Sequence, residues 1–478
     1  MVASEAAPFV KTGGLADIMG GLPPALARLG HEVVVLIPKY RKVQVTGAER
    51  IYYEMPVWLG GTQYNTSVDR IVDRGVSYLF LNCPLLFDRE GIYNLGERDY
   101  PDNHIRFGVF CRAAMEIVRR IFRPDVIHYH DWQASLVAPY LRFNYRTDPT
   151  FTGVKLLLTI HNLGFQGIFA LYQGGEIDLD PSLRNPAGAL EFHGNLNLLK
   201  GGIVFADAIN TVSKGYAREI QTPEFGFGLD GLLRSRSDVL TGIVNGVDYS
   251  EWSPEHDPYI PRNYSAESLD GKRECKRSLL TEFGLPSGEL DRPVIGIVSR
   301  FAPQKGFDLI AAIAHELLQE DLYLTVLGSG DPAYEQMFRD LAAARPDRIG
   351  VRIGFDNPLA HCIEAGSDMF LMPSRYEPCG LNQIYSLRYG TVPVVRATGG
   401  LDDTIEEGTG FKFWGYTGGE LMECIRVALT AYQDRAAWLE RMRLCMRQDF
   451  SWDVSAGEYA ALYQRLAKPA ARGGAAAA

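Results

Sequence analysis

Three loops combine charged residues with glycine or proline, and their spacing suits the binding of an anion or a sugar. The first loop is KTGGLAD, residues 11–17, which runs into the helical pattern GGLPPALARLG. Paired glycines at a strand-to-helix turn let backbone N–H groups approach a phosphate, and the helix N-terminus adds partial positive charge. Lys11 adds a full charge. On the glycines alone an ordinary surface turn is the simpler interpretation, whereas the complete pattern is much more specific.

The second loop is SRFAPQKG, residues 299–306, directly after the apolar run VIGIVS. Arg300 and Lys305 therefore lie where an open α/β sheet presents its ligand-binding loop. Two cations five residues apart could hold a diphosphate leaving group without a metal. Two solvated surface charges are the alternative. The position of the loop, between a strand and the helical pattern GFDLIAAIAHELL, favours binding.

The third loop is SRYEPCGLNQ, residues 374–383, which follows the apolar run DMFLMP. Gly380 and Leu381 open a predicted helix whose free N–H groups would point at an anion. Glu377 beside such a site suits sugar hydroxyls, because a phosphate would repel it. A favourable charge near a helix N-terminus is the alternative role for this carboxylate. The segment ATGGL, residues 397–401, adds another glycine turn after a strand.

Histidines end two predicted strands, in HYHDW at 128–132 and in TIHN at 159–162. His128, His130 and Asp131 resemble a set of metal ligands. However, alternate residues of a strand point to opposite faces, and no second cluster of ligands accompanies them. We therefore expect no metal site here.

His161 and Asn162 could donate hydrogen bonds to a sugar, and a buried histidine with satisfied hydrogen bonds is the alternative. The D-x-D pattern at residues 178–180 lies in a polar loop before Pro181 and is interpreted as chance. A G-x-S-x-G elbow, a Walker loop with lysine and serine, and a G-x-G-x-x-G turn in the right context are all missing from the sequence. Hydrolase, ATPase and dehydrogenase functions lose support.

The elements that must position these loops are strands and helices in alternation. Short β-branched runs alternate with longer helical patterns, as in parallel sheets covered by helices on both faces. The expected strands are 33–37, 125–130, 154–160 and 207–212, then 294–299, 322–328, 350–354, 368–373 and 392–397. Between the two sets, NGVD, WSPEHDP and IPRNY interrupt any regular element. We expect two doubly wound α/β domains that meet near residues 240–262, with a cleft between the carboxyl ends of their strands.

Composition indicates a globular protein of two to three domains, with 478 residues, 46% hydrophobic and 22% charged. The net charge of -10 argues against a broad surface for nucleic acid or anionic membrane. Seven scattered cysteines without a C-x-x-C pair fit a reduced cytosolic protein. No apolar run approaches the roughly 18 residues of a membrane span, and the start lacks a secretory pattern, so we expect a cytoplasmic location.

The start, MVASEAAP, is a few residues short of a complete strand, which predicts a weak first sheet edge.

Taken together, KTGGLAD, HDW, TIHNLGFQG, LLKGG, NGVD, SRFAPQKG, YEPCGL and ATGGL, in this order, resemble bacterial glycogen synthases and their starch synthase relatives. The resemblance runs from residue 3 to about residue 466. It implies a GT-B fold, in which two Rossmann-like domains face each other across a deep cleft and a C-terminal helix crosses back to the first domain. The implied domains are 1–244 and 245–449, followed by the crossover helix 450–466 and a disordered tail, 467–478.

The resemblance also implies an activity, namely transfer of glucose from a nucleotide sugar to the non-reducing end of glycogen or another α-1,4-glucan, with retention of configuration. ADP-glucose is the donor of the bacterial type, and the sequence itself shows no base-specific contact that excludes UDP-glucose. The resemblance implies no metal or other cofactor, no nucleic acid and no membrane. The sequence leaves the oligomeric state open.

Roles for individual residues follow from the same resemblance. Arg300 and Lys305 would hold the diphosphate, Glu377 a glucose hydroxyl, and Phe355 would stack on the adenine where relatives usually carry tyrosine. Tyr385 stands where many other retaining GT-B enzymes keep a second glutamate. The residues placed in catalysis are His161, Glu377, Arg300, Lys305 and Asp131, of which Asp131 has no clear role. Those placed in substrate binding are Lys11, Gly14, Asp17, Asn162, Asn245, Phe355, Cys379, Gly380, Leu381 and Thr398.

For the mechanism we expect the domains to close over the donor, with attack of the glucan 4-hydroxyl from the face that the nucleotide leaves. Two other functions compete with transfer. An isomerase or hydrolase of nucleotide sugars would release free sugar, and a silent glucan-binding protein would leave the donor intact. A plastid starch synthase is a variant of the main interpretation, although the sequence shows no transit peptide.

Overall fold

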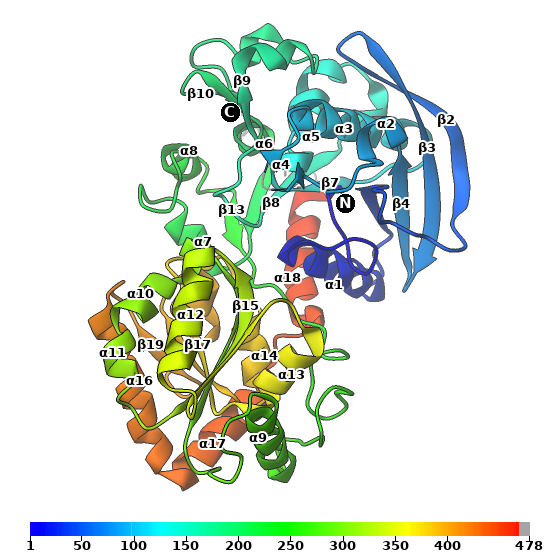
Figure 1. The fold of residues 1–478 in the computed structure, drawn as a ribbon. Coiled ribbons are helices and arrows are strands. Elements are labelled where there is room, and N and C mark those ends of the chain that lie inside the picture. Colours follow the sequence, from blue (N-terminus) through cyan, green and yellow to red (C-terminus); the bar gives the residue numbers. More distant parts are fainter. Residues whose placement is uncertain (97, 468–478) are drawn as a thin grey trace, which may run out of the picture. The chain divides into compact units, whose positions relative to one another are not determined.

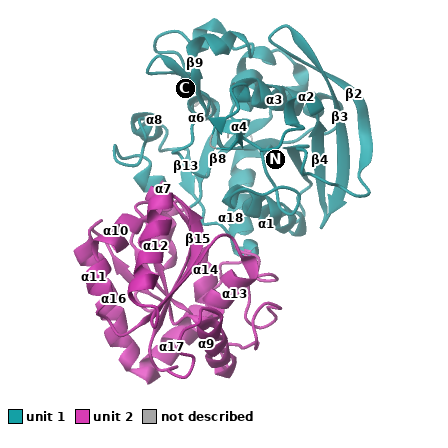
Figure 2. Ribbon diagram, viewed as in Figure 1, with its two compact units in different colours: residues 1–212, 217–246, 452–478 teal, residues 213–216, 247–451 magenta. Residues whose placement is uncertain are grey.

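The computed structural model describes residues 1–96 and 98–467, which form two compact units (Figure 2). Unit 1 contains residues 1–212, 217–246 and the chain from 452 onwards, and unit 2 contains residues 213–216 and 247–451. Asn245 and Gly246 thus belong to unit 1, beyond the expected boundary at 244. Of the tail 467–478, only Ala467 lies within the described residues, as the last residue of a helix.

One large sheet forms the centre of unit 1 (Figure 1). Its first half has the parallel order β13-β12-β8-β7, and its second half has the order β1-β4-β3-β2, in which β1 and β4 are parallel and the rest antiparallel. Val2 pairs with Leu36 of β1 and with Tyr129 of β7. The start of the chain therefore lies between the two halves, and the expectation that it forms a sheet edge is wrong. The strands are β1 (Val33–Pro38), β2 (Glu49–Leu59), β3 (Thr62–Asp73), β4 (Val76–Asn82), β7 (Val126–His130), β8 (Lys155–Ile160), β12 (Ala208–Thr211) and β13 (Leu240–Gly242).

No strand was expected between residues 38 and 125, where the structure has β2, β3 and β4. Strand β2 buries Met55, Val57 and Leu59 in alternation but exposes Trp58 on its other face, and Tyr53, at a β-bulge, is exposed as well. Apolar side chains on both faces hide the two-residue period by which a half-buried strand is recognised.

Helix α1 (Gly14–Arg28) begins at the glycine turn itself, six residues before the expected start, and continues through Pro23 and Pro24. Its buried face consists of Leu15, Ile18, Met19, Leu22 and Leu26. The C-terminal helix α18 (Trp452–Ala467) packs on α1 and β7 within unit 1. A Cβ atom at Gly21 would lie 1.9 Å from Nε1 of Trp452, so only glycine lets these helices approach so closely.

The other helices and short strands of unit 1 cover the sheet and its loops. They are α2 (Pro84–Phe87), α3 (Asn103–Arg120), α4 (Asp131–Ala134), α5 (Val137–Pro139), α6 (Leu198–Phe205), α8 (Asp230–Ser235), β5 (Asn94–Leu95), β6 (Arg98–Asp99), β9 (Ile168–Ala170), β10 (Glu191–Phe192) and β11 (Asn195–Asn197). Helix α7 (Lys214–Glu219) spans the boundary between the units.

Unit 2 is built on a parallel six-stranded sheet of order β16-β15-β14-β17-β18-β19. Counted along the chain within the unit, this is the doubly wound order 3-2-1-4-5-6, so the direction of winding reverses between β14 and β17. Ligands of such sheets bind at this switch point, outside the carboxyl ends of the strands. The strands are β14 (Val294–Phe301), β15 (Tyr323–Gly330), β16 (Ile349–Ile353), β17 (Met369–Met372), β18 (Val392–Arg396) and β19 (Phe411–Phe413).

Helices cover both faces of this sheet, and its strands are buried almost throughout, because apolar residues occupy both faces (Figure 1). The helices are α9 (Asp270–Glu282), α10 (Phe307–Ala312), α11 (Ala314–Leu317), α12 (Pro332–Ala344), α13 (Asn357–Gly366), α14 (Asn382–Arg388), α15 (Gly399–Thr404), α16 (Gly418–Gln433) and α17 (Arg435–Met446).

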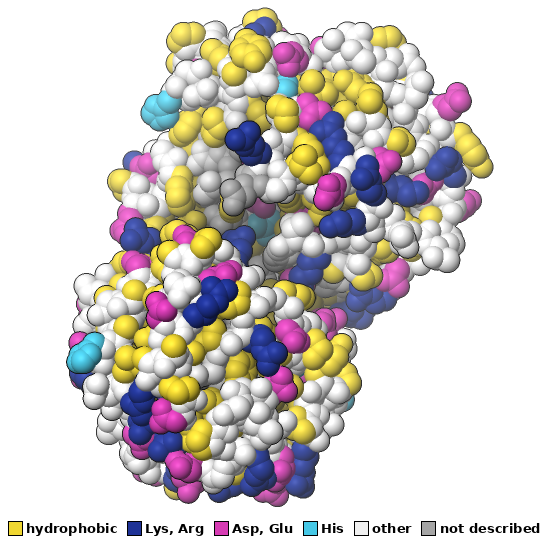
Figure 3. Space-filling view, viewed as in Figure 1, with side chains coloured by type: hydrophobic (Ala, Val, Ile, Leu, Met, Phe, Trp, Pro, Cys, Tyr) yellow, Lys and Arg dark blue, Asp and Glu magenta, His cyan; other side chains and the backbone are white. Residues whose placement is uncertain are grey.

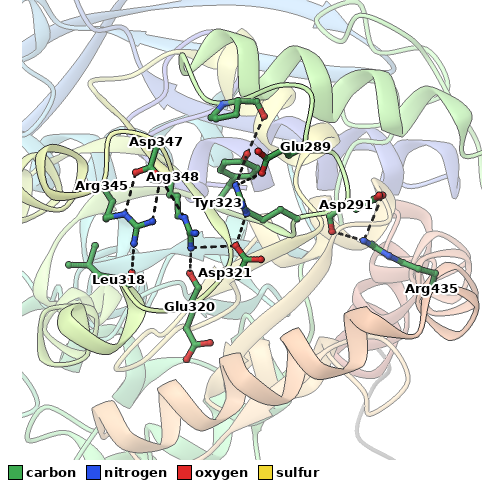
Figure 4. Close-up of polar contacts among 12 residues, drawn as sticks. Glu289, Asp291, Leu318, Glu320, Asp321, Tyr323, Arg345, Asp347, Arg348 and Arg435 are labelled. Atoms are coloured by element: carbon green, nitrogen blue, oxygen red, sulfur yellow. Dashed lines mark hydrogen bonds and ion pairs between the residues drawn. The ribbon is translucent and has the colours of Figure 1, made fainter.

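Ion pairs line the amino ends of β14, β15 and β16 (Figure 4). Arg292 contacts Asp321 and Glu289, each at 2.7 Å, and Arg348 contacts Asp321 at 3.4 Å. Arg345 pairs with Asp347 at 3.2 Å. Each arginine at this edge thus has a carboxylate partner.

On the face of the molecule shown in Figure 3, lysine and arginine side chains are interspersed with aspartate and glutamate rather than gathered in one area. Within residues 1–96 and 98–467, none of the helices has the length and apolar character of a membrane span.

Candidate active site

The switch point of unit 2 brings a cation and a carboxylate together. Lys305 lies in a short turn after β14, and Glu377 lies in the loop after β17. Lys305 Nζ donates to Glu377 Oε2 at 2.6 Å, and the buried Ser374 hydroxyl donates to the same oxygen at 2.9 Å. Glu377 is only 5% exposed. The sequence predicted both residues for this site but not their contact with each other.

Close packing of the two loops produces that contact. Gly306 has φ +75°, and a Cβ atom there would lie 1.9 Å from the carbonyl oxygen of Pro373. The Arg375 N–H donates to the carbonyl oxygen of Gln304 at 2.8 Å. Position 306 therefore requires glycine for two reasons, namely its positive φ and the close approach of the neighbouring loop.

Arg300 and Phe355 offer a charge and a ring at the same edge of the sheet. Arg300 is the next-to-last residue of β14, and Phe355 follows β16. The Arg300 side chain is exposed and has no hydrogen bond or ion pair with another described residue. Phe355 is 91% exposed, although exposure of a large ring normally costs free energy. Both side chains are available to a ligand.

The segment before α14 is held by the glycine turn of ATGGL. Gly380 has φ +74°, and Leu381 is the N-cap of α14, so the helix begins at Asn382. The Gly400 N–H donates to the Glu377 carbonyl oxygen at 3.0 Å, and a Cβ atom at Gly400 would lie 2.1 Å from the carbonyl oxygen of Cys379. The buried Thr398 is the N-cap of α15. The predicted residues Cys379, Gly380, Leu381 and Thr398 thus surround one packed turn.

In unit 1, the ends of β7 and β8 bring the two histidine motifs together, because His130 and Thr159 are partners in the parallel pairing. His130 Nδ1 lies 2.9 Å from His161 Nε2. The backbone N–H of His161 donates to Asp131 Oδ1 at 2.7 Å. Asp131 has φ +55°, an uncommon angle for a residue other than glycine, and such strain concentrates at functional sites.

Burial shifts the titration of both of these groups of unit 1, so that His161 is neutral at pH 7 and Asp131 titrates close to that pH. Burial lowers the pKa of His161 to about 3. Burial raises the pKa of Asp131 to about 7, although the backbone N–H groups of His161 and Asn162 oppose this rise. His161 Nδ1 is buried and has no hydrogen-bond partner among the described residues, so it can take part in a hydrogen bond with a ligand.

The KTGGLAD loop is open to a ligand. Lys11 Nζ pairs with Asp17 Oδ1 at 2.6 Å. No atom among the described residues lies within 4 Å of the Cβ positions of Gly13 and Gly14, and neither glycine has positive φ. Neither packing nor backbone angle requires these glycines, whereas a ligand that approaches the backbone would. Asn245 is buried in unit 1, and its Oδ1 has no partner in the described part of the chain.

Other candidates have structural contacts. Asp178 pairs with Arg112 at 3.2 Å, and Asp180 accepts from the backbone of Ser182, so both acids of the D-x-D pattern have partners. His128 contacts Tyr463 and Thr159. Within the described residues, no group of three or more histidine, cysteine, aspartate or glutamate side chains has the geometry to hold a metal ion.

Comparison with known proteins gives two matching family models. One, described as the starch synthase catalytic domain, matches residues 1–235, and one described as glycosyl transferases group 1 matches residues 286–443. A glycogen synthase of Koribacter versatilis is 50% identical over 476 residues, which cover 97% of each chain. The chain belongs to the glycogen and starch synthase family.

A glycogen synthase of an Anaeromyxobacter species is another family member, 47% identical over 98% of this chain and 99% of its own. Among solved structures, the catalytic domain of starch synthase IV from Arabidopsis thaliana, bound to ADP and acarbose, aligns with a TM-score of 0.89 at 32% identity and covers 98% of each chain. The family resemblance and the GT-B fold predicted from the sequence are confirmed.

Sequence reasoning missed the polar residues that hold the site residues in place. Ser374 opens the loop SRYEPCGLNQ, three residues before Glu377, but the motif assigns no role to it. Glu5, seven residues before Thr12, accepts a hydrogen bond from the Thr12 hydroxyl in the KTGGLAD loop. Tyr93, 81 residues after Thr12, donates to the same carboxylate. The spacing of these residues in the sequence does not predict their contacts, because the contacts depend on how the chain folds.

Proposed function

We propose that this chain transfers glucose from ADP-glucose to the non-reducing end of glycogen or another α-1,4-glucan, with retention of configuration. The observation that carries the proposal is the Lys305–Glu377 pair at the switch point of unit 2, with Arg300 beside it. Family membership and the ADP of the Arabidopsis structure support it.

In unit 2, the cations are proposed to bind the diphosphate and the carboxylate to bind the sugar. Arg300 and Lys305 neutralise the diphosphate as it leaves, the step in which negative charge develops. Glu377 accepts a hydrogen bond from a glucose hydroxyl, and Ser374 and Lys305 fix its carboxylate for that purpose. The backbone between Cys379 and Leu381 binds the distal phosphate, with Thr398 beside it, and Phe355 stacks on the adenine.

In unit 1, the proposed contacts are to sugar hydroxyls and to the donor phosphate. His161, neutral at pH 7, and Asn162 bind hydroxyls of the transferred glucose. Asp131 holds the backbone of His161 in place. Lys11, Gly14 and Asp17 form the loop that approaches the donor, and Asn245 offers its free amide oxygen. The reaction requires both groups of residues to reach the same nucleotide sugar.

The proposed reaction takes place on one face of the glucose. The bond from C1 to the diphosphate oxygen breaks, the bond from C1 to the 4-oxygen of the acceptor forms, and the acceptor proton passes to the departing diphosphate. No side chain is assigned as a covalent nucleophile. The seven cysteines are all free, which fits reaction in a reducing compartment such as the cytoplasm.

The test is to incubate the purified protein with glycogen and either ADP-glucose or UDP-glucose, with and without EDTA, and to follow nucleotide release and labelled glucose in the polymer. We expect incorporation from ADP-glucose that EDTA does not reduce. Release of nucleotide without incorporation would support a hydrolase or isomerase, and binding of glycogen with intact donor would support a silent binding protein.

A second measurement tests the stereochemistry. NMR of the first product should show the new linkage in the α configuration of the donor. An inverted linkage would overturn the same-face mechanism while leaving glucosyl transfer itself intact.

A further inference from the structure

Glu5 is a buried carboxylate outside the motifs discussed so far. It is 3% exposed and lies in the segment between Val2, which pairs with β1 and β7, and the KTGGLAD loop. A buried carboxylate is costly unless donors surround it. Glu5 has three such donors, and two of them belong to one residue of that loop.

That residue is Thr12, whose hydroxyl donates to Glu5 Oε1 at 2.6 Å and whose backbone N–H donates to Oε2. Both carboxylate oxygens are therefore used to hold one residue of the loop. The third donor is the Tyr93 hydroxyl, which donates to Oε1 and lies 2.7 Å from the Ser4 hydroxyl. Tyr93 thus fixes the same carboxylate oxygen that accepts from the Thr12 hydroxyl.

Among the described residues, Thr12 itself is hydrogen-bonded to Glu5 alone, while the rest of the loop is also held by the Lys11–Asp17 pair and by the bond from the Ala7 N–H to the Ala16 carbonyl oxygen. Thr12 is exposed, and so are its neighbours Lys11, Gly13 and Gly14. No atom of the described residues lies within 4 Å of the Cβ positions of the two glycines. The contact with Glu5 is thus the buried attachment of a segment whose other face is open.

We propose that Glu5 is a positioning residue that holds the backbone of Thr12, and through it Lys11 and Gly14, in the conformation that receives the nucleotide sugar. The inference rests on the proposed function for the identity of the ligand. The ordering of the loop by Glu5 is independent of that function, because it can be measured without substrate.

Unit 1 contains a matched control for this contact. Asp180 Oδ1 accepts from the backbone N–H of Ser182 at 2.8 Å and from the Ser182 hydroxyl at 2.5 Å. This is the same pair of donors that Thr12 offers to Glu5, but at an exposed carboxylate and on a single oxygen. Asp180 ends the D-x-D pattern and Ser182 follows two residues later, and both lie outside the candidate site. Asp180→Asn and Ser182→Ala therefore remove a carboxylate charge and a hydroxyl donor, as Glu5→Gln and Thr12→Val do.

The experiment measures KM and kcat for ADP-glucose in these variants and in Thr12→Ser, which keeps both donors. We expect Glu5→Gln and Thr12→Val to raise KM for ADP-glucose about tenfold, as loss of a hydrogen bond to a charged group would. Thr12→Ser should remain close to the unmodified protein, and the two control variants should change neither constant.

Hydrogen exchange of the amides at residues 11–14, without substrate, provides the second readout. Exchange should be faster in Glu5→Gln than in Asp180→Asn. Equal exchange in these two variants, or equal KM values in Thr12→Val and Ser182→Ala, would overturn the inference. If the unmodified protein fails to transfer glucose, the proposed function fails, and hydrogen exchange still decides whether Glu5 orders the loop. If Glu5→Gln does not fold, the exchange comparison is made between Thr12→Val and Thr12→Ser.

Discussion

The two edges of the sheet in unit 2 use their cations differently. At the amino edge, Arg292, Arg345 and Arg348 each contact a carboxylate (Figure 4). At the carboxyl edge, Arg300 has no partner among the described residues, and Lys305 pairs with a glutamate that is itself held by a serine. Arginines of the amino edge therefore stabilise the fold through ion pairs, whereas Arg300 at the carboxyl edge remains available to a ligand.

The largest effect is expected at the Lys305–Glu377 pair. Lys305→Ala and Glu377→Ala should each lower kcat by about 100-fold or more, because a preorganised charge is removed from the reacting groups. Steady-state rates at saturating ADP-glucose and glycogen measure this.

Lys412 offers the control, since it pairs with Asp402 at 2.7 Å and its side chain is 20% exposed, against 21% for Lys305. Lys412→Ala should leave kcat unchanged. Near-normal rates in Lys305→Ala would remove this pair from the active site.

Arg300→Ala and Arg292→Ala compare the two edges directly. Arg300→Ala should lower kcat about tenfold or more, as loss of a cation from a developing negative charge would, and leave the melting temperature unchanged. Arg292→Ala should keep its activity and lower the free energy of unfolding by up to about 1 kcal/mol, since its partner Asp321 is well exposed. A melting curve and a rate measurement on each variant suffice. If Arg292→Ala lowers kcat and Arg300→Ala lowers only stability, the proposed difference between the two edges is wrong.

Phe355 tests whether an exposed ring at the carboxyl edge serves the ligand. Phe355→Ala should raise KM for ADP-glucose about two- to tenfold, the range expected for loss of an aromatic stack, with little change in kcat or stability. Phe355→Tyr should retain the low KM. Leu439→Ala, at an exposed apolar side chain of α17, should leave KM unchanged. An unchanged KM in Phe355→Ala would mean that the ring does not contact the donor.

The smallest effect concerns Asp131, at the carboxyl edge of the sheet in unit 1. Its pKa is raised by burial from 3.8 to about 7, so the folded chain keeps a proton that the unfolded chain has lost above pH 4. The free energy of unfolding should therefore decrease as the pH rises from about 4 to 7. Asp131→Asn lacks this proton, and asparagine tolerates a positive φ, so its stability should depend less on pH over that interval. Denaturant unfolding at several pH values measures the difference, and parallel curves for the two proteins would contradict it.

The sequence predicted the parts of the fold that bury one continuous apolar run. Strand β14 extends to Phe301, two residues beyond the predicted end, and Arg300 remains at the predicted edge. By contrast, α1 begins at Gly14 because its buried face extends over the glycines and prolines that punctuate the sequence there. The burial of apolar side chains in α1 thus outweighs the low helix propensity of its glycines and prolines.

The candidate site divides in a similar way. Lys305 and Glu377 could be found because each follows a strand, and parallel strands end at one edge. Ser374 and Glu5 could not, because several polar residues stand near Glu377 and Thr12 in the sequence, and only the structure shows which of them make the contacts. The neutral state of His161 also escaped prediction, because burial decides it and no motif records burial.

The C-terminal helix has a consequence for the synthesis of the chain. After the short segment 213–216, the chain enters unit 2 again at Val247 and leaves it at Ser451, and these two residues pair. Unit 2 is thus complete as soon as Ser451 has left the ribosome. Unit 1 must wait for α18, whose Tyr459 and Tyr463 contact Asn210 and His128. The unit that is translated first is therefore the last to be completed.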